Sequence, residues 1–205
     1  MLGNDVVDIG ELDSLLHERF DARVFGAAER GAIAASSEPS RMRWVLWAAK
    51  ESAFKALRRL DRSVTFRPLR FSVTSDLEPH DRGTWMHVAH ERNDVCVRIE
   101  NGASFLHAVA HLDAGAAATT LSAVARAEEI APGATLREAV RKLARDGIAQ
   151  ALSLNASELE VAREARIPHL AWRGATLPGA LSLSHDGRFV AFACQIAQTA
   201  AGGLS

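Results

Sequence analysis

The segment SRMRWVLWAAKESAFKALRRL, residues 40–60, has a clear helical periodicity. Its apolar residues recur every three or four positions and Ser40 is a suitable N-cap, so the spacing predicts an amphipathic helix over residues 40–60. Around this helix the sequence predicts strands at 2–9, 69–74, 85–89, 95–99 and 105–112, separated by Asp, Gly and Asn turns. A long helix packed on an antiparallel meander is therefore expected for this part of the chain.

The later part of the sequence repeats this plan. A capping pattern at Thr135 begins a second predicted helix over 135–152. Predicted strands follow at 159–162, 170–172, 181–184 and 188–196. We interpret the repetition as a weak internal duplication. The prediction is an α+β fold of two pseudo-symmetric halves, 1–112 and 119–205, each with a long helix on an antiparallel sheet and joined by a linker at about 113–118.

The composition is that of an ordinary globular protein. The 205 residues include 24 Lys and Arg against 25 Asp and Glu, and 48% are hydrophobic, which excludes a disordered chain and a disulfide scaffold. A net charge of −1 argues against a general nucleic-acid binder. Asp5 and Asp8 lie where a signal peptide needs a basic start and an apolar run. We expect a cytoplasmic protein with no nucleic-acid or membrane partner.

Three places in the sequence offer chemistry. Glu51 and Lys55 are four residues apart, so they lie on one stripe of the predicted helix; an exposed ion pair that contributes roughly a few tenths of a kcal/mol is the alternative. Asp5 and Asp8 are embedded in an apolar strand, where a buried carboxylate needs a partner such as a metal ion, although an exposed strand edge would also accept them. Ser184 and His185 are adjacent on a strand and point to opposite sides, which disfavours a nucleophilic triad.

Taken together, these motifs resemble the 4′-phosphopantetheinyl transferase superfamily. The resemblance is carried by the segments GNDVVDI at 3–9, WAAKESAFKA at 47–56 and LSH at 183–185, and it extends to 23–29 and 69–73. It implies transfer of phosphopantetheine from coenzyme A to a serine of an acyl or peptidyl carrier protein, with Mg²⁺ and release of 3′,5′-ADP. The pathway would be fatty-acid, polyketide or nonribosomal peptide biosynthesis.

The resemblance also implies roles for individual residues. Asp5 and Glu51 would bind Mg²⁺, and Glu51 or a water that it holds would be the base for the carrier serine. Lys55 and His185 would act on the phosphates, and Lys50, Lys55, Ser184, His185 and Arg166 would contact coenzyme A. Arginines around the helix (Arg41, Arg43, Arg58, Arg59 and Arg62) would either dock an acidic carrier protein or form a solvated helix face.

Two departures from the family pattern bear on the prediction. Val7 stands where larger members carry a second acid, so two protein metal ligands are expected, and Arg166-Ile167-Pro168 replaces a Gly-Lys-Pro motif. The motif order is that of the small trimeric holo-acyl-carrier-protein synthases, but the chain is longer. We therefore expect a monomer, an intramolecular pseudo-dimer with coenzyme A between its halves. The alternatives are a non-catalytic member that binds coenzyme A or carrier protein, and an unrelated α+β domain.

Overall fold

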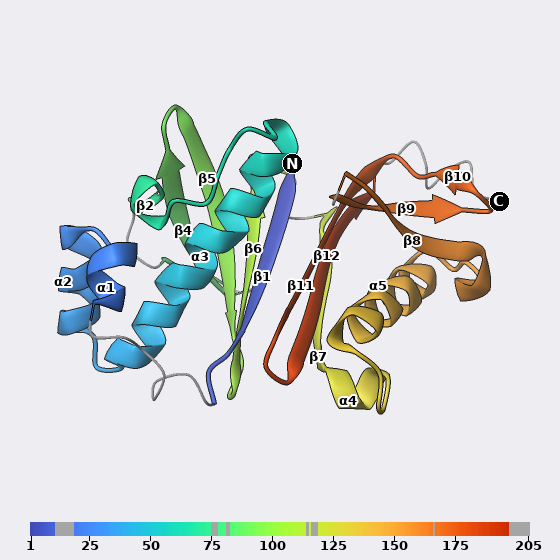
Figure 1. Cartoon of the computed structure of the whole chain (residues 1–205), viewed down its shortest axis with the longest axis horizontal. Helices are drawn as coiled ribbons and strands as arrows, with labels where there is room; N and C mark the ends of the chain where they lie inside the picture. The colour runs from blue at the N-terminus through green and yellow to red at the C-terminus, as the bar shows by residue number, and fades with distance from the viewer. Residues whose placement is uncertain are drawn as a thin grey trace.

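The computed structural model describes residues 1–10, 19–74, 78–80, 83–113, 115, 119–165 and 167–196. Two groups of helices and strands lie side by side, and β1 and β11 face each other where the groups meet (Figure 1). In chain order the elements are β1 (Leu2–Asp8), α1 (Phe20–Val24), α2 (Ala27–Ala35), α3 (Pro39–Leu60), η2 (Pro68–Arg70), β2 (Ser72–Val73), β3 (Glu78–His80), β4 (Gly83–His90), β5 (Asn93–Asn101), β6 (Phe105–His111), β7 (Leu121–Arg126), α4 (Ala127–Ile130), α5 (Leu136–Ala151), η4 (Ala156–Glu158), β8 (Leu159–Glu164), β9 (Ile167–Trp172), β10 (Ala175–Thr176), β11 (Gly179–Asp186) and β12 (Phe189–Ile196).

Helix α3 confirms the helix predicted over residues 40–60 and begins one residue earlier. Pro39 occupies its first turn, where the missing N–H costs no hydrogen bond. Its buried stripe is rich in alanine, which lets the helix axis lie close to the sheet. Across the described ranges, no helix is both long enough and apolar enough to cross a lipid bilayer.

The first sheet is antiparallel, with strand order β1-β6-β5-β4-β2 and β3 paired to β4. Strand β1 pairs with β6 over its whole length, from Leu2 opposite His111 to Asp8 opposite Phe105. The strands predicted near 85–89, 95–99 and 105–112 are confirmed by β4, β5 and β6. The strand predicted over 69–74 is wrong in its first part, because Pro68–Arg70 forms a 3₁₀ turn and only Ser72 and Val73 pair as a strand, β2. Pro68 fixes its own φ and suits the start of such a turn.

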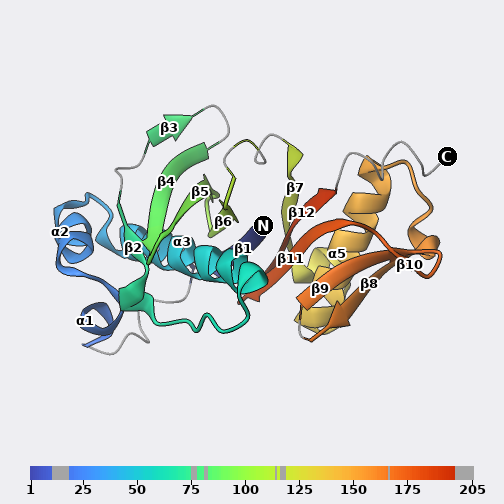
Figure 2. The ribbon, with the colours of Figure 1, turned by 90° about the horizontal axis from the view of Figure 1, so that it is seen from above.

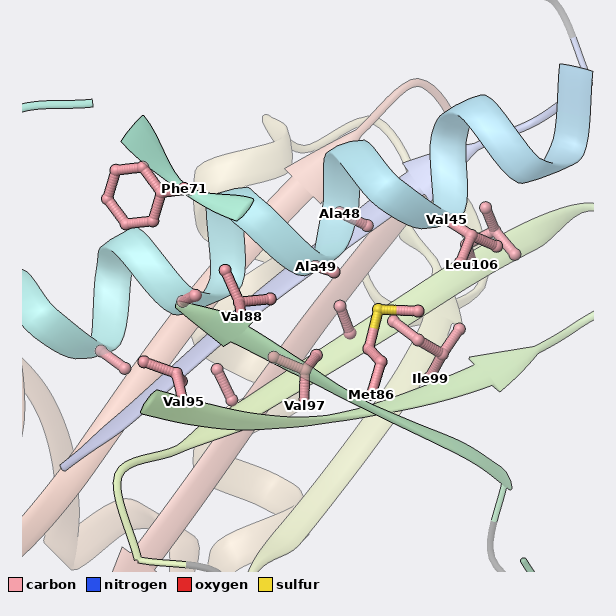
Figure 3. Close-up of a cluster of buried hydrophobic side chains, with 14 of the residues drawn as sticks. Val45, Ala48, Ala49, Phe71, Met86, Val88, Val95, Val97, Ile99 and Leu106 are labelled. Atoms are coloured by element: carbon pink, nitrogen blue, oxygen red, sulfur yellow. The ribbon is translucent and has the colours of Figure 1, made fainter. Parts of the chain in front are cut away.

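The hydrophobic core of this part lies between α3 and the sheet. Figure 3 shows Val45, Ala48 and Ala49 on the helix above apolar side chains of β4, β5 and β6. Met86, Val88, Val95, Val97, Ile99 and Leu106 are all at most 1% exposed. Close packing of this kind resists changes in volume, so α3 is held firmly on the sheet. The residues on the opposite stripe of α3 remain available for a site.

The C-terminal part has an antiparallel sheet of order β11-β12-β7 and a second small sheet of order β10-β9-β8. Helix α5 begins at a capping box formed by Thr135 and Glu138, as the sequence indicated. It packs Ile148 and neighbouring residues against Phe192 of β12. Figure 2 shows α5 on the opposite side of β11 and β12 from β1 and α3. The structure is therefore α+β with antiparallel sheets, while the pseudo-symmetry of the halves and the linker at 113–118 stay predictions.

Strand β1 holds the two parts together, and all seven of its residues are buried. Its alternation divides the side chains: Gly3, Asp5 and Val7 face α3, and the residues between them face β11 and β12. On the second face, the backbone N–H of Asn4 donates to Ser182 Oγ at 2.9 Å and its side-chain amide donates to Ser184 Oγ at 2.9 Å. The two carboxylates of the sequence motif thus have different partners: Asp5 pairs with Lys55 of α3, and Asp8 pairs with Arg188.

Gly3 lies directly beneath the backbone of α3. A Cβ atom at this position would collide with the carbonyl oxygen of Ser52 and come within 2.6 Å of the amide nitrogen of Ala56. Because both atoms belong to a packed helix, neither moves without displacing α3. This contact explains why the motif begins with glycine.

We expect Gly3→Ala to lower the free energy of unfolding by about 3 kcal/mol or more, near or above the upper range for overpacking a core. Urea denaturation followed by circular dichroism would measure the loss. Gly31→Ala is the matched control, since a Cβ there meets no atom within 4 Å. Equal stability of the two variants would contradict the role of the Gly3 contact.

Asp8 joins β1 to the turn after β11. Arg188 Nη2 lies 2.7 Å from Asp8 Oδ1, and both its side-chain Nε and its backbone N–H donate to Oδ2. These hydrogen bonds lower the pKa of Asp8 from its ordinary 3.8 to about 2. Stability from the pair is therefore complete above pH 3.8 and is lost as the pH falls through about 2.

We expect Asp8→Asn to destabilise the protein by about 2 kcal/mol at pH 7, the free energy equivalent of that pKa shift. The difference from the wild type should shrink as the pH is lowered from 4 toward 2, because the wild-type carboxylate then takes up a proton as well. Urea unfolding at a series of pH values would test this. A difference that stays constant over the series would show that the ion pair is not its source.

Candidate active site

A cavity of about 520 Å³ opens between α3 and the C-terminal part. From the N-terminal side it is lined by Asp5 and by one face of α3 and its neighbours. From the C-terminal side come residues of α5, β8 and β11. The lining residues are Asp5, Val6, Val7, Phe20, Trp44, Trp47, Glu51, Lys55, Arg137, Val140, Arg141, Arg163, Leu183, Ser184, His185 and Asp186.

Asp5, Glu51 and Lys55 meet in this cavity. Lys55 Nζ lies 2.7 Å from Asp5 Oδ1 and 3.4 Å from Glu51 Oε1. Glu51 and Lys55 are one turn apart on α3, and Asp5 reaches them because Gly3 lets β1 lie against the helix. The side chain of Asp5 is 8% exposed, whereas that of Lys55 is 27% exposed to the cavity. Sequence reasoning placed these three residues together, and the structure brings them into contact.

Burial is the main influence on the charge of this cluster. It raises the pKa of Asp5 to about 7, although the nearby ammonium of Lys55 opposes the shift. Burial also disfavours the ammonium itself, but attraction by Asp5 and Glu51 outweighs that effect and raises the pKa of Lys55. An ionised Asp5 thus costs stability near neutral pH, and a cation at this point relieves the cost. The cluster is built around one shared positive charge.

The donor set suits a hard divalent cation. Asp5 and Glu51 both direct an oxygen toward a single point, now held by Lys55 Nζ. Within the described ranges, no group of three or more His, Cys, Asp or Glu side chains is arranged to hold a metal ion. The protein would therefore supply two carboxylates and leave the remaining positions to water and phosphate, as Mg²⁺ sites commonly do.

Ser184 and His185 reach the cavity from β11. Ser184 is buried, and its Oγ accepts a hydrogen bond from the side chain of Asn4. His185 is exposed and lines the cavity beside Asp186. Ser184 thus supports the strand next to the site while the imidazole of His185 is open to a ligand.

The first 120 residues match a known family. A model of the 4′-phosphopantetheinyl transferase superfamily matches residues 1–120, a stretch that contains Asp5, Glu51 and Lys55. The chain belongs to this superfamily. A search among curated proteins gave no match. Membership supports a phosphopantetheinyl transferase, since enzymes of this family use coenzyme A and modify carrier proteins.

Lys50, which family resemblance had assigned to coenzyme A, has other partners in the structure. Its side chain is 0% exposed, and Nζ lies 2.7 Å from Glu29 Oε2 and 2.9 Å from the carbonyl oxygen of Val24. Glu29 in turn accepts a backbone hydrogen bond from Val73. Lys50 is not among the described residues that line the cavity. The ion pair instead ties α1 and α2 to α3 and β2.

We expect Lys50→Met to lower the free energy of unfolding by about 3–5 kcal/mol, because it leaves the Glu29 carboxylate buried without a counter-ion. Lys142→Met, which removes an exposed i, i+4 partner of Asp146, should cost less than about 1 kcal/mol. Thermal and urea unfolding would compare the two. At a temperature where Lys50→Met is folded, KM for coenzyme A should change less than about threefold, a shift below about 0.7 kcal/mol. A large rise in KM for coenzyme A with unchanged stability would contradict this interpretation and support the predicted contact between Lys50 and coenzyme A.

Arg166, the remaining predicted coenzyme A contact, lies outside the described residues. Its neighbours Ala165 and Ile167 line a second cavity of about 290 Å³, which adjoins the first and shares Lys55, Arg163 and Leu183 with it. Basic side chains from α3, from the turn after it and from β8 line this second cavity: Lys55, Arg58, Arg59, Arg62 and Arg163. From the sequence alone, Arg58, Arg59 and Arg62 are expected to dock a carrier protein or to form a solvated helix face.

Several cavity residues carried no signal in the sequence. Arg137, Arg141 and Arg163 lie on α5 and β8, far from the motifs in the chain, and were missed. Asp186 was missed as well, although it directly follows His185. Its carboxylate accepts a hydrogen bond from the backbone N–H of Asp8 at 2.9 Å, so it also joins β1 to β11.

Proposed function

We propose that this protein transfers the 4′-phosphopantetheine group from coenzyme A to a serine of an apo acyl or peptidyl carrier protein, in a Mg²⁺-dependent reaction that releases 3′,5′-ADP. The main support is the cluster of Asp5, Glu51 and Lys55 in the first cavity, of which Lys55 also lines the second. Membership of the superfamily supports the same reaction class. The proposal includes a cytoplasmic enzyme of the holo-acyl-carrier-protein synthase type, a type that rests on the order of the motifs in the sequence. It also includes a monomer, because one chain supplies both walls of the cavity.

The proposed transfer is a single displacement at phosphorus. The carrier serine attacks the phosphorus atom that bears the pantetheine arm, a Ser O–P bond forms, and the P–O bond to 3′,5′-ADP breaks. Glu51, or a water that it holds, accepts the serine proton. Lys55 and His185 line the cavity where the pyrophosphate would lie, and their positive charge or N–H donors offset the charge on its oxygens. A bound Mg²⁺, held by Asp5 and Glu51, would supply Lewis-acid polarisation of the phosphoryl oxygens.

The two joined cavities suit an extended anionic ligand. The second cavity is lined by five basic residues, so we propose that it takes the nucleotide end of coenzyme A. Phe20, Trp44 and Trp47 line the other end of the first cavity, which leaves that end for the pantetheine arm and the carrier serine.

Two of the arginines proposed to dock a carrier protein have partners within the chain. Arg43 pairs with Asp21 and Arg41 donates to the Gly102 carbonyl, which reduces their role in docking a carrier.

The reaction is tested by intact mass of a panel of apo carrier proteins incubated with this protein, coenzyme A and Mg²⁺. One carrier should gain about 340 Da, the mass of one phosphopantetheine, with an equal amount of 3′,5′-ADP released. Asp5→Asn and Glu51→Gln should slow the transfer at least about 100-fold, the lower range for losing a general base. The matched control is Glu129→Gln, which should not slow the transfer, because Glu129 is an exposed residue of α4 outside both cavity linings.

A different result would favour the non-catalytic alternative. If no carrier gains mass while coenzyme A binds equally well with and without Mg²⁺, the protein is a coenzyme A binder of this fold. Transfer that survives both Asp5→Asn and Glu51→Gln would instead reject the metal-site assignment.

A further inference from the structure

The ammonium of Lys55 occupies the point at which the two candidate metal ligands converge. Its Nζ is 2.7 Å from Asp5 Oδ1 and 3.4 Å from Glu51 Oε1, distances of direct ion pairs. A divalent cation that uses both carboxylates must therefore displace Lys55 first. Two positive charges cannot share so small a space, because their repulsion in a partly buried site is large.

The surroundings of Lys55 restrict where its side chain can go. Lys55 also lines the second cavity, where the other charged residues in the lining are Arg58, Arg59, Arg62 and Arg163. Among the described residues around that cavity there is no acid. Withdrawal of Lys55 from Asp5 into this cationic region is thus unfavourable unless an anion is bound there.

We propose that Lys55 is an exchangeable counter-ion that couples binding of a phosphate ligand to binding of the metal. Without ligand it neutralises Asp5 and Glu51 and opposes metal binding. When phosphate groups enter between the two cavities, Lys55 pairs with them instead and releases the carboxylates. The identity of the ligands rests on the function proposed above, but the competition between ammonium and metal does not.

The coupling follows from linkage. A ligand that offers Lys55 an anionic partner favours the displaced side chain, and so does a metal bound to the carboxylates. Each ligand must then raise the affinity of the other by the same factor. The consequence is that the free protein binds the metal weakly and the ligand-loaded protein binds it tightly.

The test measures Mn²⁺ binding by electron paramagnetic resonance, with and without saturating coenzyme A and with correction for Mn²⁺ bound by coenzyme A alone. Without coenzyme A, Lys55→Met should bind Mn²⁺ at least about tenfold more tightly than the wild type, because the variant no longer has an ammonium that repels the metal ion. A tenfold gain in affinity corresponds to only a modest part of that repulsion. Lys55→Arg keeps the cation and should bind no more tightly than the wild type. Lys142→Met, which removes the ammonium of an i, i+4 pair on α5 outside both joined cavities, is the matched control and should leave Mn²⁺ affinity unchanged.

Coenzyme A provides the second comparison. It should tighten Mn²⁺ binding at least about tenfold in the wild type and clearly less in Lys55→Met. Equal Mn²⁺ affinity of wild type and Lys55→Met without coenzyme A would overturn the inference, as would tighter binding by Lys55→Arg. If transfer to a carrier occurs but Lys55→Met does not bind Mn²⁺ more tightly, the proposed function stands and the counter-ion role falls. If Lys55→Met binds Mn²⁺ more tightly and no carrier is modified, the counter-ion role stands and the proposed function falls.

Discussion

The contact between Gly3 and the backbone of α3 is the constraint on which the site depends. With no side chain at Gly3, β1 lies against the helix at Ser52 and Ala56. Two residues further along, Asp5 then reaches Lys55 and Glu51. A side chain at position 3 would push β1 away from the helix, and the carboxylate of Asp5 would lose its partner. Because β1 also pairs with β6, the same contact fixes the sheet relative to α3.

The opposite face of β1 attaches the C-terminal part. Ser182 and Ser184 accept hydrogen bonds from Asn4, and Arg188 holds Asp8. These bonds place β11, and with it His185, against the cavity that Asp5 and α3 form on the other side. One buried strand therefore aligns both walls, which agrees with the proposal that a single chain completes the site.

Two ion pairs on α3 differ in what surrounds them. Lys50 is fully enclosed and has carbonyl acceptors in addition to Glu29. Lys55 is partly exposed and borders both cavities. A buried pair of the first kind is costly to break, whereas the partner exchange that we propose for Lys55 needs the open space beside it. This difference separates a lysine that supports the fold from the lysine, five residues away on the same helix, for which we propose a role in the site.

The sequence by itself determined the main helices, most strands, and the residue types of the acidic and basic cluster. Helical periodicity over 40–60 and alternation over 85–112 report local burial, and Asp5 stood out because a carboxylate in an apolar strand needs a partner. Glu51 and Lys55 stood out only through the resemblance of their segment to the family motif. Strand β7 was missed because three of its residues are the small Ser122, Ala123 and Ala125, and its apolar and polar residues do not alternate. Tertiary structure alone decided that Lys50 turns inward to Glu29, that Asp8 meets Arg188, and that Arg163 joins the arginines of α3 around a second cavity. These pairings join residues between 21 and 180 positions apart, and no local pattern encodes which distant side chain meets another.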